Sequence, residues 1–488
     1  MVFNSITFLA FFLAVFVLYY IVARNNGKKQ NWILLISSYF FYGYVSLKML
    51  PLLLGVTIAV YFIGLIIHKM NNQKMVSLFS TIGIFLSLGL LLYFKYFNFF
   101  IHEFQKLFQI TGINTNTISF NVLLPLGISF FTFKLISYIV EIQRGKINPA
   151  KDFVVFSTYI SFFPTILSGP IDKPNDLIPQ LQKTKRSFNY NLITEGFRQF
   201  LWGLFQKSVI ADNIAIPLNN VWGDIPNQSG IVLIIASLLY SIQLYTDFSG
   251  YSHMAIGVGK ILGFKITSNF NYPFFSRNVA EFWRKWHISL TSWLTDYVFM
   301  PLNIKFRNFG KIGMITAIMI NMIAVGIWHG ANWTFVFFGV YHGLLFVPLV
   351  YSNAIFKKKK LRTNKYGLPS FIDFSKIVST FFLISLALIM FRAENVYQFF
   401  DYFKGLFDLS IPSVNELRGL GLRRLIVPLI FAGILLITEW NNRDLEFPFT
   451  ELEFRYNKPI RWAIYALLIF CVGMYMPSNE SPFIYFQF

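Results

Sequence analysis

Cysteine, acidic residues and charged residues in general are scarce in this sequence. Cys471 is the single cysteine among 488 residues, which excludes a disulfide framework and a cysteine cluster for metal. Charged residues make up only 13% of the chain, whereas 55% are hydrophobic and 19% aromatic, and this balance excludes an ordinary water-soluble domain. No basic region precedes the first apolar run, so we expect that run to be a retained span and not a cleaved signal.

Metal and nucleotide motifs are also missing. None of the six histidines pairs with another at the short helical spacing of a zinc motif, so no metal site is predicted. The glycines from Gly250 to Gly263 follow no strand and lack the spacing of a phosphate-binding loop. We therefore expect no permanently bound cofactor.

Basic residues outnumber acidic residues by 42 to 22, which gives a net charge of +20. They lie in short clusters between apolar runs, as cytoplasmic loops require, and this distribution argues against nucleic acid as a partner. The sequence therefore predicts an all-α, polytopic protein of the lipid bilayer, with about 11–13 spans in one domain over 1–488. The predicted spans are 6–23, 31–46, 50–67, 76–98, 119–141, 195–217, 231–260, 312–328, 333–351, 376–392, 424–440 and 461–477, with re-entrant or interfacial pieces near 153–168 and 288–302.

The basic loops predict an orientation. Arg24, Lys69 and Arg144 lie in basic loops that follow or flank odd-numbered spans, which places the N-terminus outside the cytoplasm. The loop that holds Arg443 and Arg455 would then face the cytoplasm.

His329 follows an apolar segment long enough to cross most of a bilayer, and an imidazole there needs a partner, a cavity or a reaction. One interpretation is close helix packing through the pair Gly326 and Gly330, with the histidine hydrogen-bonded locally. The other is a general base, because the pKa of imidazole lies near ~6.5. Both interpretations stay open on the pattern alone.

The segment 281–296 predicts an amphipathic helix with tryptophans and His287 on its apolar face. An interfacial helix with tryptophan anchors explains the periodicity, but not the histidine. Asp247 lies in another apolar span, where it either bonds to a helix break at Gly250 or faces a cavity. The run 162–174 is broken by three prolines and a glycine, which predicts a re-entrant element lining a cavity near Ser168.

Six dispersed motifs resemble the membrane-bound O-acyltransferases, and most closely the bacterial branch that acetylates alginate and other exported polysaccharides. The motifs are Leu124-Pro-Leu-Gly-Ile-Ser-Phe-Phe-Thr-Phe133, Phe162-Phe-Pro with Ser168-Gly-Pro170, Tyr245-Thr-Asp-Phe-Ser-Gly-Tyr251, Phe282-Trp-Arg-Lys-Trp-His287, Trp328-His-Gly-Ala331 and Ile484-Tyr-Phe-Gln-Phe488.

This resemblance implies a catalytic histidine at His329 in a tunnel that joins the two membrane faces, with His287 as the second family position. We expect His329 to act as general base and His287 to support it, with Asp247, Trp328 and Ser168 as candidates for the cavity lining. The resemblance also implies acetyl-CoA as a cytoplasmic donor, a location in the bacterial inner or plasma membrane, and a periplasmic or extracellular acetyltransferase partner or a polysaccharide as acceptor.

Two alternatives stay open. A D-alanyl transfer protein for teichoic acids belongs to the same superfamily and would load from a carrier protein. A proton-coupled transporter would use the intramembrane histidines and Asp247 to relay protons.

Overall fold

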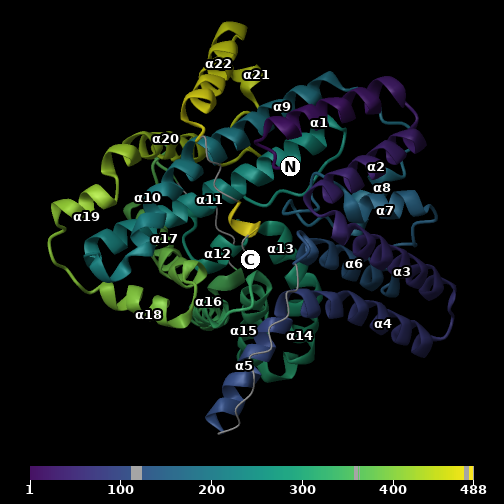
Figure 1. Cartoon of the computed structure of the whole chain (residues 1–488), viewed down its shortest axis with the longest axis horizontal. Coiled ribbons are helices and arrows are strands. Elements are labelled where there is room, and N and C mark those ends of the chain that lie inside the picture. The colour runs from purple at the N-terminus through teal and green to yellow at the C-terminus, as the bar shows by residue number, and fades with distance from the viewer. Residues whose placement is uncertain (112–123, 357–360, 362, 478–482, 487–488) are drawn as a thin grey trace. The chain divides into compact units, whose positions relative to one another are not determined.

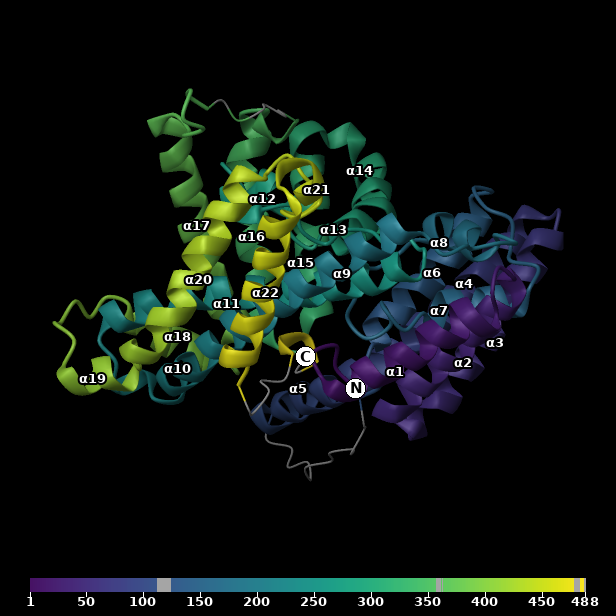
Figure 2. The same cartoon turned by 90° about the horizontal axis from the view of Figure 1, so that it is seen from above.

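The computed structural model describes residues 1–111, 124–356, 361, 363–477 and 483–486, and the regular elements in this part of the chain are helices (Figures 1 and 2). Eight helical segments within it are long and apolar enough to cross a membrane. The predicted all-α, polytopic membrane fold is therefore confirmed. The eight segments are Leu47–Lys69, Gln73–Ile110, Gly230–Ile261, Arg307–His329, Trp333–Tyr351, Phe371–Arg392, Arg423–Asn441 and Lys458–Tyr475.

Four other predicted spans, 6–23, 31–46, 119–141 and 195–217, do not belong to these eight, and 119–123 lies outside the described residues. The predicted span 195–217 shows why a predicted span can be absent from the eight. It is divided into α9 (Tyr190–Phe205), a π-helical turn and α10 (Asp212–Gly223), and it carries the charged side chains of Lys207 and Asp212. Charges within an apolar run lower its suitability as a lipid-facing span.

The described chain forms two compact units. Unit 1 comprises Met1–Phe197 and Ala255–Thr267, and unit 2 comprises Arg198–Met254 and Ser268–Phe488, so α9 and α11 (Gly230–Ile261) contribute to both. The single domain over 1–488 stays a prediction. The helices that lie wholly in unit 1 are α1 (Ile6–Val17), α2 (Gly27–Val45), α3 (Leu50–Lys69), α4 (Gln73–Leu91), α5 (Phe97–Ile110), α6 (Ile128–Gln143), α7 (Phe153–Ser161) and α8 (Pro174–Leu181).

Between α7 and α8, the chain of unit 1 forms buried turns where the sequence predicts a broken element. The fully buried ammonium group of Lys134 on α6 donates to the carbonyl oxygen of Tyr159 at 3.2 Å and to Oγ1 of Thr165 at 2.9 Å. These bonds satisfy the cation and tie the turns to α6, because a buried charge without partners would be costly.

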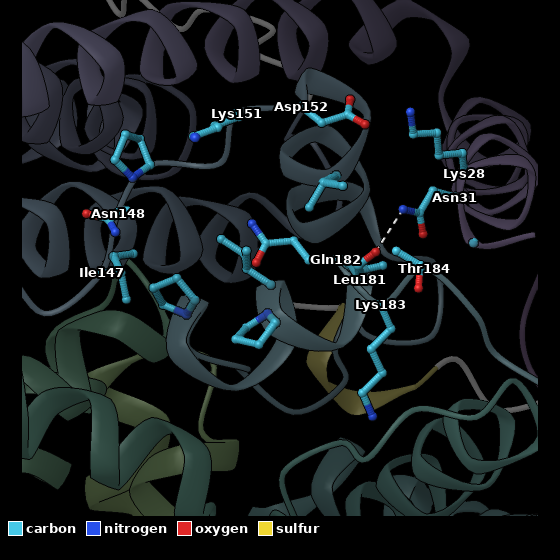
Figure 3. Close-up of a pocket in the computed structure, with 16 residues that line it drawn as sticks. Lys28, Asn31, Ile147, Asn148, Lys151, Asp152, Leu181, Gln182, Lys183 and Thr184 are labelled. Carbon is cyan, nitrogen blue, oxygen red and sulfur yellow. Dashed lines mark hydrogen bonds between the residues drawn. The ribbon is translucent and has the colours of Figure 1, made fainter.

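A pocket of about 550 Å³ lies in unit 1 beside the start of α2 and the end of α8 (Figure 3). Lys28, Lys151 and Lys183 are among its lining residues, and Asn31 donates a 2.8 Å hydrogen bond to the carbonyl oxygen of Leu181 at its side. The cytoplasmic position of the loops that carry Lys28 and Lys151 stays a prediction.

Unit 2 holds the remaining helices. It includes α15, which ends at His329, and α16, which begins four residues further on at Trp333, and the two lie side by side in both views (Figures 1 and 2). The helices of unit 2 besides α10 and most of α11 are α12 (Val279–Trp283), α13 (Ile288–Leu294), α14 (Met300–Lys305), α15 (Gly310–His329), α16 (Trp333–Tyr351), α17 (Phe371–Arg392), α18 (Val396–Gly405), α19 (Val414–Gly419), α20 (Leu422–Asn441), α21 (Leu452–Arg455) and α22 (Lys458–Tyr475).

Candidate active site

His329 is the last residue of α15, and its position depends on the contact between α15 and α16. A Cβ atom on Gly326 would lie 2.0 Å from the carbonyl oxygen of Phe335, and one on Gly339 would lie 2.5 Å from that of Met322. The two helices therefore approach as closely as the glycine spacing predicts. The helix break after His329 is also present, because the backbone of Gly330 is extended.

Aromatic rings surround the imidazole of His329, whose residue is only 4% exposed. The ring centroids of Phe391, Tyr485 and Phe338 lie 4.8, 5.7 and 6.0 Å from that of His329. A neutral imidazole has one acceptor nitrogen and one N–H donor, so it can take a proton from a hydroxyl group brought against it. The surrounding rings keep bulk water away from such a step.

His287 occupies a turn between α12 and α13, and it is fully buried with a φ of +43°. The predicted continuous helix over 281–296 is therefore wrong. The backbone N–H of Ile288 donates to the carbonyl oxygen of Asn269 at 2.9 Å, and the N–H of Asn271 donates to that of Lys285 at 3.0 Å. These tertiary bonds replace helical ones, and sequence periodicity does not reveal them.

The structure brings His287 and His329 together around two shared rings. The centroid of His287 lies 5.5 Å from Trp328 and 6.0 Å from Tyr485, and both of these rings also contact His329. Phe248 closes the other side of His287, at 4.7 Å. Within the described part of the chain, neither ring nitrogen of His287 has a hydrogen-bond partner.

Tyr485 is a site residue that sequence reasoning did not assign. It lies in the short helical turn Ile484–Phe486, and the centroid of its ring lies 4.2 Å from that of Phe248. The available signal was the aromatic motif 484–488, of which 487 and 488 lie outside the described residues. Nothing in that motif indicates which distant residues it contacts.

Asp247 anchors this turn. Its Oδ2 accepts a 2.9 Å hydrogen bond from the backbone N–H of Ile484, and its Oδ1 lies 2.7 Å from Nζ of Lys207. Lys207 also donates to Oδ1 of Asp212 at 2.7 Å, and all three charged side chains are buried. The pairing satisfies charges that would otherwise be costly inside the protein.

The alternative of a helix break at Gly250 is wrong, because α11 continues without interruption to Ile261. Gly250 instead permits a close approach, since a Cβ there would lie 2.7 Å from the carbonyl oxygen of Gly203. Sequence reasoning missed the ion partners Lys207 and Asp212, although two charges in an apolar run were a usable signal.

A third histidine joins the cluster through Phe338. The ring of His342 lies 4.5 Å from that of Phe338, and its Nδ1 accepts a 3.2 Å hydrogen bond from Nε1 of Trp283. Because the indole nitrogen can only donate, a neutral His342 carries its proton on Nε2. This bond fixes α12 against α16.

Two other buried polar residues, His253 on α11 and the candidate Ser168, lie outside this cluster. His253 pairs with the Gln199 side chain at 3.1 Å and contacts Phe447. Ser168 belongs to the buried turns of unit 1, where its hydroxyl has no hydrogen-bond partner in the described structure. Among the predicted site residues, unit 2 thus groups His329, His287, Trp328 and, as an anchor, Asp247.

The helical fold and the buried histidine cluster define an α-helical protein embedded in the membrane. Comparison with known proteins identifies its family. Residues 148–391 match the membrane-bound O-acyltransferase family. The chain belongs to this family and is an acyltransferase.

Its relatives are named for three different polymers. It is 31% identical to a probable alginate O-acetylase of Pseudomonas putida, over 100% of both chains. It is 33% identical to a peptidoglycan O-acetyltransferase of Helicobacter pylori, over 86% of this chain and 82% of that one. It is 32% identical to a teichoic acid D-alanyltransferase of Streptococcus thermophilus, over 53% of this chain and 68% of that one.

Proposed function

We propose that this acyltransferase takes an acetyl group from acetyl-CoA at the cytoplasmic face of the bacterial inner membrane and passes it across that membrane. The acetyl group then serves O-acetylation of an exported or cell-wall polysaccharide. The observation that carries the proposal is the likeness to an alginate O-acetylase over the full length of both chains. The likeness to a peptidoglycan O-acetyltransferase supports the same chemistry on a second polymer.

His329 acts as the general base in this proposal. Its neutral imidazole accepts the proton of an attacking hydroxyl group while the hydroxyl oxygen bonds to the acetyl carbonyl carbon. The C–S bond of the thioester then breaks, and the proton passes from the imidazolium to the departing sulfur. The aromatic rings around His329 support this role, because they exclude water that would hydrolyse the thioester.

His287 acts as a positioning residue. It packs against Trp328, which directly precedes His329, and against Tyr485. Removing its ring would leave a void beside both groups and loosen the general base. The transporter alternative is not retained, because membership of the acyltransferase family accounts for the buried histidines.

A partner protein completes the transfer in this proposal. The longest polar stretches of the sequence are loop-sized, so no segment between the spans is large enough for a separate polysaccharide-binding domain. We therefore assign the final transfer to sugar hydroxyls to an acetyltransferase on the outer side of the membrane.

D-alanyl transfer is the second candidate function. It is favoured by the likeness to a teichoic acid D-alanyltransferase, although that likeness covers only 53% of this chain. The two candidates differ in the donor, which is acetyl-CoA in one case and a D-alanyl carrier protein in the other.

Radiolabelled acetyl-CoA supplied to the purified protein in liposomes tests the proposal. We expect the wild-type protein to consume the donor and His329→Ala to consume it much more slowly. If neither protein consumes acetyl-CoA and the wild type consumes D-alanyl carrier protein, the second candidate replaces the first. Equal consumption of acetyl-CoA by both proteins would remove His329 from the mechanism.

A further inference from the structure

Unit 2 has a pocket of about 650 Å³ between α10, α19 and the start of α20. Its walls include the aliphatic side chains of Ile216, Pro217 and Leu417. Three arginines, Arg418, Arg423 and Arg424, also line it. A pocket of this size holds several side chains of a ligand or partner.

The three arginines carry charge that the described structure does not neutralise. All three are exposed, and none forms an ion pair with a described carboxylate. The nearest acidic residue in sequence, Glu416, is already engaged, because it accepts hydrogen bonds from the backbone N–H groups of Ser229 at 2.7 Å and Ser413 at 3.0 Å. These bonds anchor α19 and leave the arginines available for an external anion.

The pocket lies at the end of α20 where basic residues are not expected. From Leu422 the helix runs to Asn441, which leads into the loop of Arg443 and Arg455 that the charge distribution assigns to the cytoplasm. A helix of this length spans about 30 Å, enough to cross the hydrocarbon layer. On that assignment of the Arg443 loop, the arginines at the opposite end of α20 lie at the outer face, although basic residues usually favour cytoplasmic loops.

One helix joins this pocket to the histidine cluster. Asn219 and Trp222 lie on α10, which also contributes Ile216 and Pro217 to the pocket. Oδ1 of Asn219 accepts a 2.7 Å hydrogen bond from Nη2 of Arg392, and the guanidinium lies 5.2 Å from the ring of Trp222. The preceding residue, Phe391, contacts the imidazole of His329. A ligand bound in the pocket would therefore be separated from the histidine cluster by one helix, α10.

We propose that this arginine pocket docks an acidic segment of the partner acetyltransferase on the outer side of the membrane. The proposal rests on the proposed function and specifies the surface that receives the partner. Arginine clusters recognise acidic motifs through paired N–H donors. The described lining includes no aromatic ring, and its aliphatic walls fit the side chains of a peptide better than a polar sugar polymer.

A binding measurement tests the docking surface. The full-length protein in nanodiscs of zwitterionic lipid is titrated with a fluorescein-labelled peptide that alternates glutamate and leucine. The variant combines Arg418→Gln, Arg423→Gln and Arg424→Gln, and the control is Lys404→Gln on α18, an exposed cation in the same outer segment. We expect the triple variant to bind about 10-fold more weakly or worse and the control to bind as the wild type does.

Donor consumption separates this proposal from the proposed function. The triple variant should consume donor at the wild-type rate, because the arginines do not touch the histidine cluster. If neither the wild type nor His329→Ala consumes acetyl-CoA while the triple variant still loses peptide binding, the proposed function fails and the docking surface stands.

Three results would overturn the docking proposal. Equal peptide binding by the triple variant and the wild type is one. The second is displacement of the peptide by a soluble polyuronate at lower concentration than by unlabelled peptide, which would assign the pocket to a glycan. The third is displacement by vesicles of anionic lipid, which would assign it to lipid headgroups.

Discussion

The carboxylate of Asp247 accepts a 2.9 Å hydrogen bond from the backbone N–H of Ile484, which lies 237 residues further along the chain. The same carboxylate pairs with Lys207, and the next residue after Ile484 is Tyr485, whose ring contacts both His287 and His329. A buried ion pair thus determines where an aromatic wall of the histidine cluster lies.

Asp247→Leu should lower stability and activity together. It removes one of the two carboxylates that pair with Lys207 in the described structure, together with the acceptor for the N–H of Ile484, and breaking a buried pair costs about 3–5 kcal/mol. Asp247→Asn keeps an acceptor oxygen for Ile484 and should be milder in both respects. Thermal unfolding in detergent and donor consumption measure the two effects. Equal stability of the leucine variant and the wild type would contradict the anchor role.

His329→Gln should reduce the rate of donor consumption by about 10²–10⁴-fold, the usual contribution of a general base. The amide keeps hydrogen-bonding groups of similar size, so the protein should still insert and unfold at a similar temperature. His68→Gln serves as the control, because His68 is exposed on α3 and belongs to unit 1. A rate unchanged in His329→Gln would exclude proton transfer by this residue.

His287 can be tested with two substitutions that differ in backbone preference. The residue has a φ of +43°, where asparagine is tolerated better than alanine, so His287→Ala should lose about 1 kcal/mol more stability than His287→Asn. Both should reduce activity, because each removes the ring that packs on Trp328. Unfolding temperatures and rates for the pair separate the backbone effect from the loss of the ring. Wild-type activity in either variant would argue against positioning.

Gly326→Ala should destabilise unit 2 and impair activity. The added Cβ would lie 2.0 Å from the carbonyl oxygen of Phe335, so α15 must move and carry His329 with it. Gly433→Ala is the matched control, because its Cβ would meet no atom within 4 Å and alanine favours the helix by about 1 kcal/mol. The unfolding temperature should fall for Gly326→Ala and should stay equal or rise for Gly433→Ala. The opposite order would refute close packing.

Glu416 makes the anchor of α19 dependent on pH. Hydrogen bonds from the backbone N–H groups of Ser229 and Ser413 lower the pKa of this carboxyl from 4.5 to about 2. The stabilisation is therefore complete above the ordinary carboxyl pKa and is lost as pH falls toward 2. Glu416→Gln should remove this dependence. Limited proteolysis of the loop around Ser413 at neutral pH and at pH 3 compares the two proteins, and identical profiles would contradict the assignment.

The sequence predicts the parts of this site that depend on local pattern. The helix break after His329 follows from Gly330 at the end of an apolar run, and the close contact of α15 and α16 follows from glycines spaced four apart. The buried turns between α7 and α8 follow from their prolines.

The remaining parts depend on distant contacts. The turn at His287 is held by the backbone of residues 269–271, which overrides a regular helical periodicity. The bond between Asp247 and Ile484 joins two segments with no complementary pattern. The ion partner Lys207 could have been suspected from charge in an apolar run, but its pairing with Asp247 could not.

The separation between Asp247 and Ile484 also sets an order of assembly during synthesis. The hairpin of α15 and α16 needs only residues 310–351, so its glycine contact can form while the residues after 351 are still being synthesised. The aromatic wall at Tyr485 can join the histidines only after Ile484 has been made. A nascent chain therefore has this helix pair well before the aromatic wall beside its histidines is complete.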